Sequence, residues 1–360
     1  MGEAAGRLKS VVETWAPRMQ AAGIAFNDAL ALAEEAGEWP RWCAVWSAAA
    51  ARHAAQAAQA EAQGRLLTAG EALARAALCY HFAQFMFFDD PAQKEAAARA
   101  KVETFARAAP LLSPPARALT IPYESGVLRG YLRLPGASPA PLAVLIPGSD
   151  STKEEFPSLE EHFLKRGLAT FSFDGPGQGE GRVHGPLQPD WGPVLTAVLG
   201  ALRGQAGLTG RVGVMGMAFG GHLALQGAAA APELGALVCM NGFFDMGGFW
   251  PGIPEVYKAN MRHALGAETA EETRLRALRF SLAGARPPAC PTLVIHGAKD
   301  RIFPLEEAHR IQAFIGARCE LAEYPQGNHV CNNVAYLYRP LVADWMAERL
   351  GGRVAPPAGR

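Results

Sequence analysis

The sequence predicts a two-part α/β protein, in which a helical domain precedes a mostly parallel, doubly wound β-sheet. The chain has 360 residues, more than one ordinary domain needs, and its hydrophobic content of 49% is typical of a globular protein. Residues 1–112 are rich in alanine and carry apolar residues at three- and four-residue spacing, which predicts helices. Runs that resemble β-strands begin only after the linker Ser113-Pro114-Pro115, and they alternate with helical segments.

Residues 113–350 are predicted to form the sheet domain. Because strands and helices alternate, the sheet should be mostly parallel and covered on both faces. Between residues 241 and 287 the periodicity becomes helical, with helices expected at 253–265 and 270–282, which predicts a small helical cap inserted at the edge of a site. Residues 351–360 are expected to form a flexible tail. The candidate strands are 127–134, 142–146, 169–173, 212–215, 237–240, 293–295 and 319–324.

One strand-to-helix junction carries the pattern of a nucleophile elbow. Residues 216–220 read Gly-Met-Ala-Phe-Gly, which is Gly-x-Ser-x-Gly with alanine in place of serine. A β-rich run precedes this turn and a helix-forming run follows it, so Ala218 stands where a serine nucleophile would be exposed. The nucleophile position is therefore predicted, but its hydroxyl is missing.

An acid and a base follow in the order that such an elbow requires. Asp300 comes after the apolar strand 291–295, and His329 lies in a loop before the last helix. A serine hydroxyl needs an imidazole to remove its proton, and the imidazole needs a carboxylate to fix its tautomer. A helix cap at Asp300 and a polar loop residue at His329 would explain each residue alone. Their joint order favours the catalytic interpretation.

A loop after the strand at 142–146 is a candidate for the oxyanion hole. Backbone N–H groups near Ser149 and Asp150, together with that of Phe219 after the nucleophile position, are predicted to bind the developing charge. An ordinary turn that caps a helix is the alternative. The turn Asp174-Gly175-Pro176-Gly177-Gln178-Gly179 lacks the ending of a phosphate-binding P-loop and should shape the floor of the site.

These motifs together resemble the FrsA-like esterase branch of the α/β-hydrolases. The resemblance rests on the loop Ser151–Glu155, the turn 174–179, the elbow, Asp300 and His329, and residues 76–85 resemble the central helix of that branch's N-terminal helical domain. It implies an α/β-hydrolase fold, with residues 1–112 as a helical lid. It also implies serine-type hydrolysis of an activated carbonyl, because the branch includes hydrolases of carbon–carbon bonds. The sequence departs from the branch at Ala218.

Three hypotheses address Ala218. In the first hypothesis, the natural protein has serine there and this chain was altered to trap a ligand. In the second, the chain is a natural binding protein that does not turn over. In the third, the fold catalyses a lyase or decarboxylase reaction in which His329 is acid and base. We favour the first, because relaxed constraint would tend to remove the acid, base and oxyanion loop as well. Cys331 lies beyond the base in the chain, a poor position for a replacement nucleophile.

The expected substrate is aromatic or polyketide-like. Carbon–carbon cleavage needs a stabilised carbanion as leaving group, so a β-diketone or an aryl ketone is predicted, with carboxylester hydrolysis as the alternative. The aromatic residues predicted to line the pocket are Tyr80, Phe85, Phe243, Phe244 and Trp250, although filling the core would explain them equally well.

Charge, apolar run length and cysteine content indicate which partners and which cellular location to expect. The 34 basic and 34 acidic residues balance and form no basic stripe, which disfavours a nucleic-acid partner. Apolar runs are too short for a membrane span, and the six scattered cysteines indicate reduced thiols, so a cytoplasmic protein is expected. The predicted chemistry needs no cofactor and no metal. A homodimer is left open.

Overall fold

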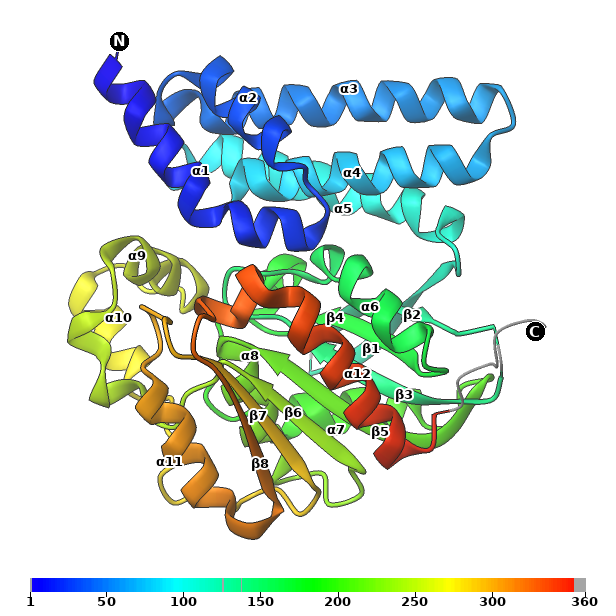
Figure 1. Ribbon diagram of the computed structural model, residues 1–360, viewed down its shortest axis with the longest axis vertical. Coiled ribbons are helices and arrows are strands. Elements are labelled where there is room, and N and C mark those ends of the chain that lie inside the picture. Colours follow the sequence, from blue (N-terminus) through cyan, green and yellow to red (C-terminus); the bar gives the residue numbers. More distant parts are fainter. Residues whose placement is uncertain (1, 125, 137, 353–360) are drawn as a thin grey trace. The chain divides into compact units, whose positions relative to one another are not determined.

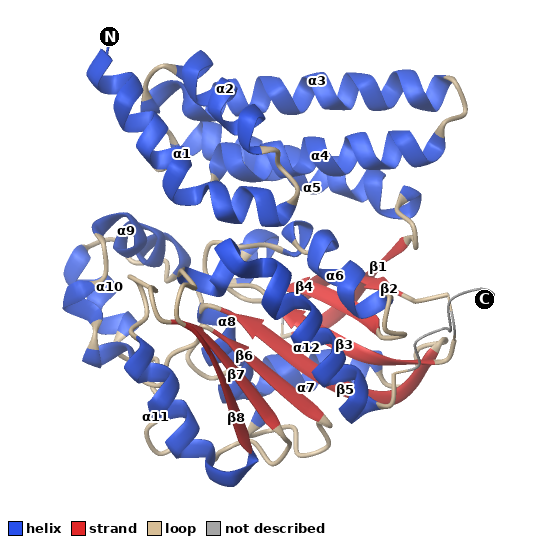
Figure 2. Ribbon diagram, in the orientation of Figure 1, coloured by secondary structure: helices blue, strands red, loops and turns tan. Residues whose placement is uncertain are grey.

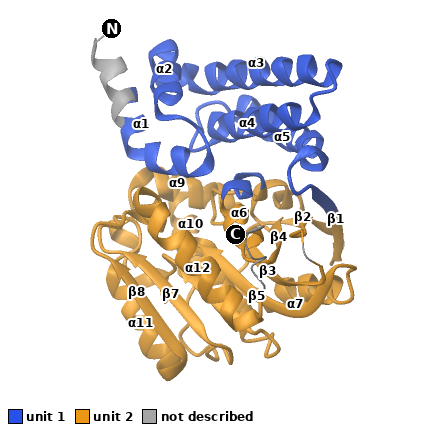
Figure 3. Ribbon diagram, turned by 45° about the vertical axis from the view of Figure 1, so that its right-hand side comes forward, with its two compact units in different colours: residues 1–118, 154–158 blue, residues 119–153, 159–360 orange. Residues whose placement is uncertain are grey.

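The computed structural model describes residues 2–124, 126–136 and 138–352, and the chain divides into two compact units (Figure 3). The first comprises residues 1–118 with 154–158, and the second comprises 119–153 with 159–360. The sequence did not predict that 154–158 belongs to the helical unit. Its carboxylates explain this, because Glu155 accepts two hydrogen bonds from Arg18 at 2.7 and 2.8 Å, and Glu154 forms a buried ion pair with Lys101 at 3.0 Å.

The described residues of the first unit form helices α1 to α5 (Figure 1). Alanine side chains at the contacts between α3, α4 and α5 form a buried cluster, and small side chains let helix backbones approach closely. Asp90 begins α5, because its carboxylate accepts a hydrogen bond from the Gln93 amide at 3.0 Å. The helices are α1 (Gly2–Ala22), α2 (Phe26–Ala36), α3 (Trp42–Ala62), α4 (Leu66–Gln84) and α5 (Pro91–Ala108), with short 3-10 turns at Trp39–Arg41 and Ala109–Leu111.

The second unit contains an eight-stranded sheet in the order β1-β2-β4-β3-β5-β6-β7-β8. β2 pairs antiparallel with β4, and the pairs from β4 through β3, β5, β6 and β7 to β8 are all parallel, as predicted. The sequence did not predict β1. Its residues do not alternate regularly between buried and exposed, so the strand has no clear two-residue pattern. The strands are β1 (Ala116–Tyr123), β2 (Gly126–Arg133), β3 (Ala140–Ile146), β4 (Ala169–Asp174), β5 (Leu208–Met217), β6 (Ala236–Met240), β7 (Thr292–Gly297) and β8 (Cys319–Tyr324).

Helices cover both faces of this sheet, with α12 in front of the strands and α7 behind them in Figure 2. Every residue of β3, β4, β6 and β7 is buried, as expected for strands covered on both sides. The helices are α6 (Pro157–Leu164), α7 (Gly192–Leu202), α8 (Phe219–Ala228), α11 (Leu305–Ile315) and α12 (Ala335–Leu350); 3-10 turns lie at Lys153–Glu155 (η3), Gly179–His184 (η4), Gly316–Arg318 (η7) and His329–Val334 (η8).

The predicted helical insertion lies between β6 and β7. It contains α9 (Glu255–Ala264) and α10 (Ala270–Ala277), preceded by 3-10 turns at Met246–Gly248 and Trp250–Gly252. Of the predicted tail, residues 353–360 lie outside the described residues. No helix within the described ranges combines the length and the apolar character that a membrane span requires.

Candidate active site

Ala218 lies at a sharp turn between β5 and α8. Its backbone has φ 52° and ψ −119°, a conformation that is strained for a residue with a side chain. The two flanking glycines make the turn possible. A Cβ on Gly216 would lie 1.9 Å from the Gly220 carbonyl oxygen, and a Cβ on Gly220 would lie 2.4 Å from the carbonyl oxygens of Ile146 and Pro147. The local geometry is that of a nucleophile elbow.

Asp300 and His329, the candidate acid and base, lie in hydrogen-bond contact. Nδ1 of His329 lies 2.8 Å from Oδ2 of Asp300, whose side chain is fully buried. Oδ1 of the same carboxylate accepts hydrogen bonds from the amides of Ile302 and Phe303 at 2.8 and 3.1 Å. Burial raises the pKa of Asp300, but the charge and the hydrogen bond of His329 outweigh burial and hold the pKa below its ordinary value. The ionised carboxylate leaves Nε2 as the ring nitrogen that can accept a proton.

Asn241 is a third member of this group that the sequence did not single out. Its fully buried amide donates a hydrogen bond to Oδ2 of Asp300 at 2.8 Å, so that one oxygen accepts from both Asn241 and His329. Asn241 follows β6 with φ 44°, a backbone conformation in which asparagine is enriched. An asparagine directly after a buried strand was the available signal.

Cys331 does not replace the nucleophile. Its thiol is buried and donates a hydrogen bond to Oδ1 of Asn241 at 3.6 Å. Burial raises the pKa of Cys331 to about 12, so the reactive thiolate is not available near neutral pH.

A cavity of about 30 Å³ lies beside Ala218. It brings together the nucleophile position, the base and all three residues predicted for the oxyanion hole. The helical insertion contributes five more lining residues. The residues that line the cavity are Ser149, Asp150, Ala218, Phe219, Met246, Ile253, Tyr257, Asn260, Met261, Ile302, Phe303 and His329.

The loop that carries Ser149 lies against the elbow. A Cβ on Gly148 would lie 3.5 Å from the Ala218 Cβ and 3.3 Å from the Met217 carbonyl oxygen. The Ser149 hydroxyl accepts a hydrogen bond at 3.0 Å from Asn260, a buried residue of α9. Asn260 was not anticipated, because its position on a polar helix gave no sign that it would reach a loop 111 residues away.

The three aromatic residues of the insertion that were predicted to line the pocket pack elsewhere in the second unit. Phe243 is buried and stacks on His222 with ring centroids 4.3 Å apart. Phe244 packs on Phe314, and Trp250 is buried. Within the described ranges these three are not among the residues that line the cavity, whose rings are Phe219, Tyr257, Phe303 and His329. A count of aromatic residues does not reveal which face of a segment they occupy.

Tyr80 and Phe85 belong to the helical unit. Phe85 is buried there, with its ring centroid 4.8 Å from that of Trp15 and with the Arg18 guanidinium above its ring. Tyr80 borders an apolar groove of the same unit, beside Cys43. Their expected role as substrate-binding residues stays a prediction.

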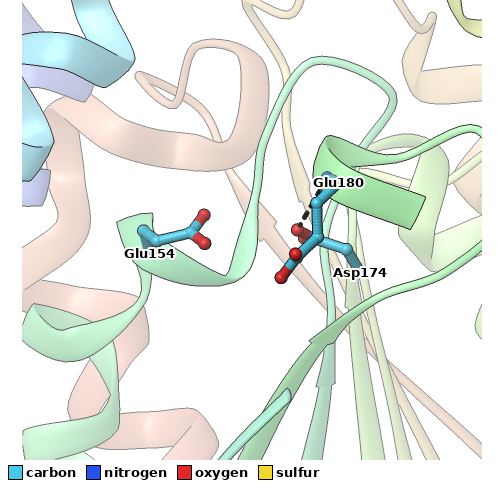
Figure 4. Close-up of side chains that lie close together, drawn as sticks. All are labelled: Glu154, Asp174 and Glu180. Atoms are coloured by element: carbon cyan, nitrogen blue, oxygen red, sulfur yellow. Dashed lines mark hydrogen bonds between the residues drawn. The ribbon is translucent and has the colours of Figure 1, made fainter. Parts of the chain in front are cut away.

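Two carboxylates of the second unit are neutralised by a buried lysine. Figure 4 shows Asp174 at the end of β4 and Glu180 on η4, where the Glu180 amide donates a hydrogen bond to Asp174 at 3.3 Å. Nζ of Lys153 lies 2.9 Å from Oδ2 of Asp174 and 2.6 Å from Oε1 of Glu180. Glu154, also drawn in Figure 4, has its own lysine partner in the helical unit. The lysine ammonium groups supply the positive charge that a cation would otherwise bring.

The sheet order, the elbow and the paired Asp300 and His329 define an α/β-hydrolase. The chain belongs to the esterase FrsA-like family, whose model matches residues 35–350. It is 34% identical over 341 residues to the 2,6-dihydropseudooxynicotine hydrolase of Paenarthrobacter nicotinovorans, covering 93% of this chain and 92% of that protein.

The structural comparison agrees with this assignment. The crystal structure of 2,6-dihydroxy-pseudo-oxynicotine hydrolase matches 94% of this chain and 97% of its own, with a TM-score of 0.86 and 32% identity. The hydrolyase poxO of Penicillium oxalicum is 33% identical over 228 residues, which are 58% of this chain and 53% of that protein. The chain therefore spans about half the length of this fungal relative.

Proposed function

We propose that this site binds an activated ketone and, with serine at position 218, cleaves the carbon–carbon bond beside its carbonyl group. The observation that carries the proposal is one cavity lined by the nucleophile position, the oxyanion loop and a histidine that is paired with a buried carboxylate. The relative that matches nearly the full chain supports this substrate class, because its name describes a hydrolase of an aryl ketone. As the chain stands, Ala218 has no oxygen to attack with, and the site binds its ligand without forming an acyl intermediate.

The proposed reaction of the serine form uses the elbow, the Ser149 loop and His329. The serine oxygen attacks the carbonyl carbon while Nε2 of His329 takes its proton. Amides of Phe219 and of the Ser149 loop bind the negative oxygen of the tetrahedral intermediate. Collapse breaks the carbon–carbon bond, and the imidazolium of His329 gives its proton to the departing carbanion. Water, deprotonated by the same imidazole, then hydrolyses the acyl-serine.

The apolar wall of the cavity favours a ketone that carries an apolar group beside its carbonyl. Met246, Ile253, Met261, Ile302 and Phe303 line it, and apolar surroundings exclude water while the carbanion is protonated. A carboxylester would use the same groups, and its alkoxide leaving group needs less stabilisation. Hydrolysis of an aryl ester is therefore the second candidate reaction.

Acid–base catalysis by His329, with no covalent nucleophile, is the alternative that fits the chain with alanine at position 218. The Asp300–His329 pair keeps its geometry beside Ala218, so His329 could move a proton in a lyase or decarboxylase reaction. Turnover by the unchanged chain that His329→Ala abolishes would favour this function. Tight binding of a ketone without turnover would favour the hydrolase with a missing nucleophile or a natural binding protein.

Restoring the oxygen tests the proposal directly. We expect Ala218→Ser to raise hydrolysis of benzoylacetone or of nitrophenyl acetate by about 10⁴-fold or more, because loss of a triad member costs on the order of 10⁴ to 10⁶ in rate. The measurement is product formation by both proteins at equal concentration. A well-folded Ala218→Ser protein that hydrolyses neither substrate would sink the hydrolase proposal.

A further inference from the structure

The loop from Pro147 to Lys153 carries the proposed oxyanion donors, and one turn of the chain holds both of its ends. At its start, the Gln178 side-chain amide donates hydrogen bonds to the carbonyl oxygens of Pro147 at 2.5 Å and of Gly148 at 3.2 Å. At its end, Asp174 accepts hydrogen bonds from the backbone amide and from Nζ of Lys153, each at 2.9 Å. Asp174 is the last residue of β4, and Gln178 lies in the turn that follows it.

The orientation of the Gln178 amide is determined by its partners. Its oxygen accepts the N–H of Gly175 at 3.0 Å, so its NH₂ group must face the two carbonyl oxygens of the loop. The side chain is fully buried, and each of these bonds would be costly to leave unmade. The Gln178 amide group therefore has a single orientation that satisfies all of these hydrogen bonds.

Holding a carbonyl oxygen also aims an amide. In a trans peptide the C=O and the N–H point to opposite sides of the peptide unit. With the carbonyl oxygens of Pro147 and Gly148 turned toward Gln178, the N–H groups of Gly148 and Ser149 are turned away from it. Ser149 lines the cavity beside Ala218, where the negative oxygen of the intermediate would form.

We propose that Gln178 is a positioning residue that presets the oxyanion hole by holding the Pro147 and Gly148 carbonyls. This rests on the proposed function, because it assigns a transition-state role to the Ser149 loop. A group that holds donors in place before the reaction lowers the barrier without strengthening substrate binding. The side chain itself does not touch the substrate.

The test compares Gln178→Met with its parent, the Ala218→Ser protein. Methionine keeps the volume of the side chain and removes its donors. We expect kcat to fall by about 10²- to 10³-fold, the usual cost of an oxyanion donor, with little change in KM. The affinity for an aryl trifluoromethyl ketone, which forms a tetrahedral adduct with serine, should fall by the same factor as kcat/KM. Binding of benzoylacetone to the Ala218 form, measured by calorimetry, should change little with Gln178→Met.

Two further variants separate positioning from general stability. Gln84→Met removes another buried glutamine, whose amide donates to the His81 carbonyl at 3.1 Å in the helical unit, and it should leave kcat unchanged. In Gln178→Glu a protonated carboxyl group can still donate, and burial raises the pKa of such a group. The activity of Gln178→Glu, divided by that of its parent at the same pH, should therefore rise as the pH falls.

The inference would be overturned if Gln178→Met kept its kcat/KM and its affinity for the trifluoromethyl ketone. Equal losses in ground-state binding and in kcat/KM would also overturn it, because they indicate a merely structural role. An inactive Ala218→Ser parent would instead reject the proposed function. In that case NMR of the Ala218 form decides whether Gln178 positions the loop: Gln178→Met must shift the amide resonances of Gly148 and Ser149, and unchanged resonances would refute it.

Discussion

His329 carries the proton transfers of the proposed reaction, and its surroundings are already arranged for that role. Its Nδ1 is held by Asp300, and the carboxylate is held in turn by Asn241 and by two backbone amides. The ring therefore has one orientation and one tautomer suited to a base, and neither depends on the side chain at position 218.

The first residue-scale prediction concerns this base. In the Ala218→Ser background, His329→Ala should abolish turnover and leave the affinity for benzoylacetone nearly unchanged, because the imidazole acts on proton transfer more than on ground-state binding. Asp300→Asn should lower kcat by about 10⁴-fold through the wrong tautomer of His329. Steady-state kinetics and calorimetry measure the two effects. Full activity of His329→Ala would show that the base is another group.

A second residue-scale prediction concerns His222, which is buried behind the elbow. Burial lowers the pKa of His222 to about 4, from an unfolded value near 6.5. Between these values the unfolded chain binds a proton that the folded chain does not, so the free energy of unfolding should fall as the pH drops from about 6.5 to 4. The contribution of His222 to that fall is about 3 kcal/mol. Urea unfolding of His222→Gln should show a smaller pH dependence, and an equal dependence in both proteins would contradict this.

At the scale of elements, the elbow depends on close contact between the end of β5 and the start of α8. A Cβ on Gly216 would overlap the backbone of Gly220, and the Gly216 backbone cannot move without disturbing the parallel pairing of β5 with β3 and β6. Gly220 in turn packs closely against the end of β3. The strained backbone of Ala218 is held by this packing, and its amide donates to the Met240 carbonyl at 2.8 Å.

Two glycine substitutions test this contact. Gly216→Ala should destabilise the protein by about 3 kcal/mol or more, because a rigid backbone clash in a buried turn resembles severe overpacking. Gly200→Ala is the matched control, since Gly200 lies on the exposed face of α7 with no atom within 4 Å of its added Cβ. It should stabilise the protein by about 0.5–1 kcal/mol. Thermal unfolding measures both, and a tolerated Gly216→Ala would refute the account of the elbow.

At the scale of the whole molecule, the helical unit holds a segment that follows directly after the oxyanion loop. Residues 154–158 belong to that unit, whereas residues 119–153 before them belong to the sheet unit. Arg18 pairs with Glu155, and the Ser158 hydroxyl donates to the Ala21 carbonyl at 2.9 Å. Since the chain runs directly from the Ser149 loop into residues 154–158, loss of these contacts should also loosen the loop.

We expect Arg18→Met, in the Ala218→Ser background, to lower both kcat and stability. The lost bidentate pair should cost about 1–3 kcal/mol, because Glu155 then lacks its main partner. Arg52→Met is the control, because the Arg52–Glu35 pair of the same unit is largely exposed and such pairs contribute little. If Arg18→Met lowers the melting temperature and leaves kcat unchanged, the helical unit does not influence the loop.

The site could be predicted from the sequence wherever its signals are local. The elbow, the strand before Asp300, the loop of His329 and the loop of Ser149 each consist of neighbouring residues whose turn and strand preferences can be recognised in the chain. Their order also predicted that they converge, because the carboxyl ends of parallel strands lie at one edge of a sheet. The aromatic pocket residues had no such local signal, and the cavity beside Ala218 is lined by other rings.

The sequence by itself therefore determined the fold class, the elbow with alanine at the nucleophile position, and the candidate acid and base, Asp300 and His329. Only the tertiary structure decided which side chains hold these groups in place. Asn241 reaches Asp300 across 59 residues, Asn260 reaches Ser149 across 111, and Gln178 reaches Pro147 across 31. Each of these is a single polar side chain whose partner depends on how distant segments pack, and no local preference of the chain encodes that distance.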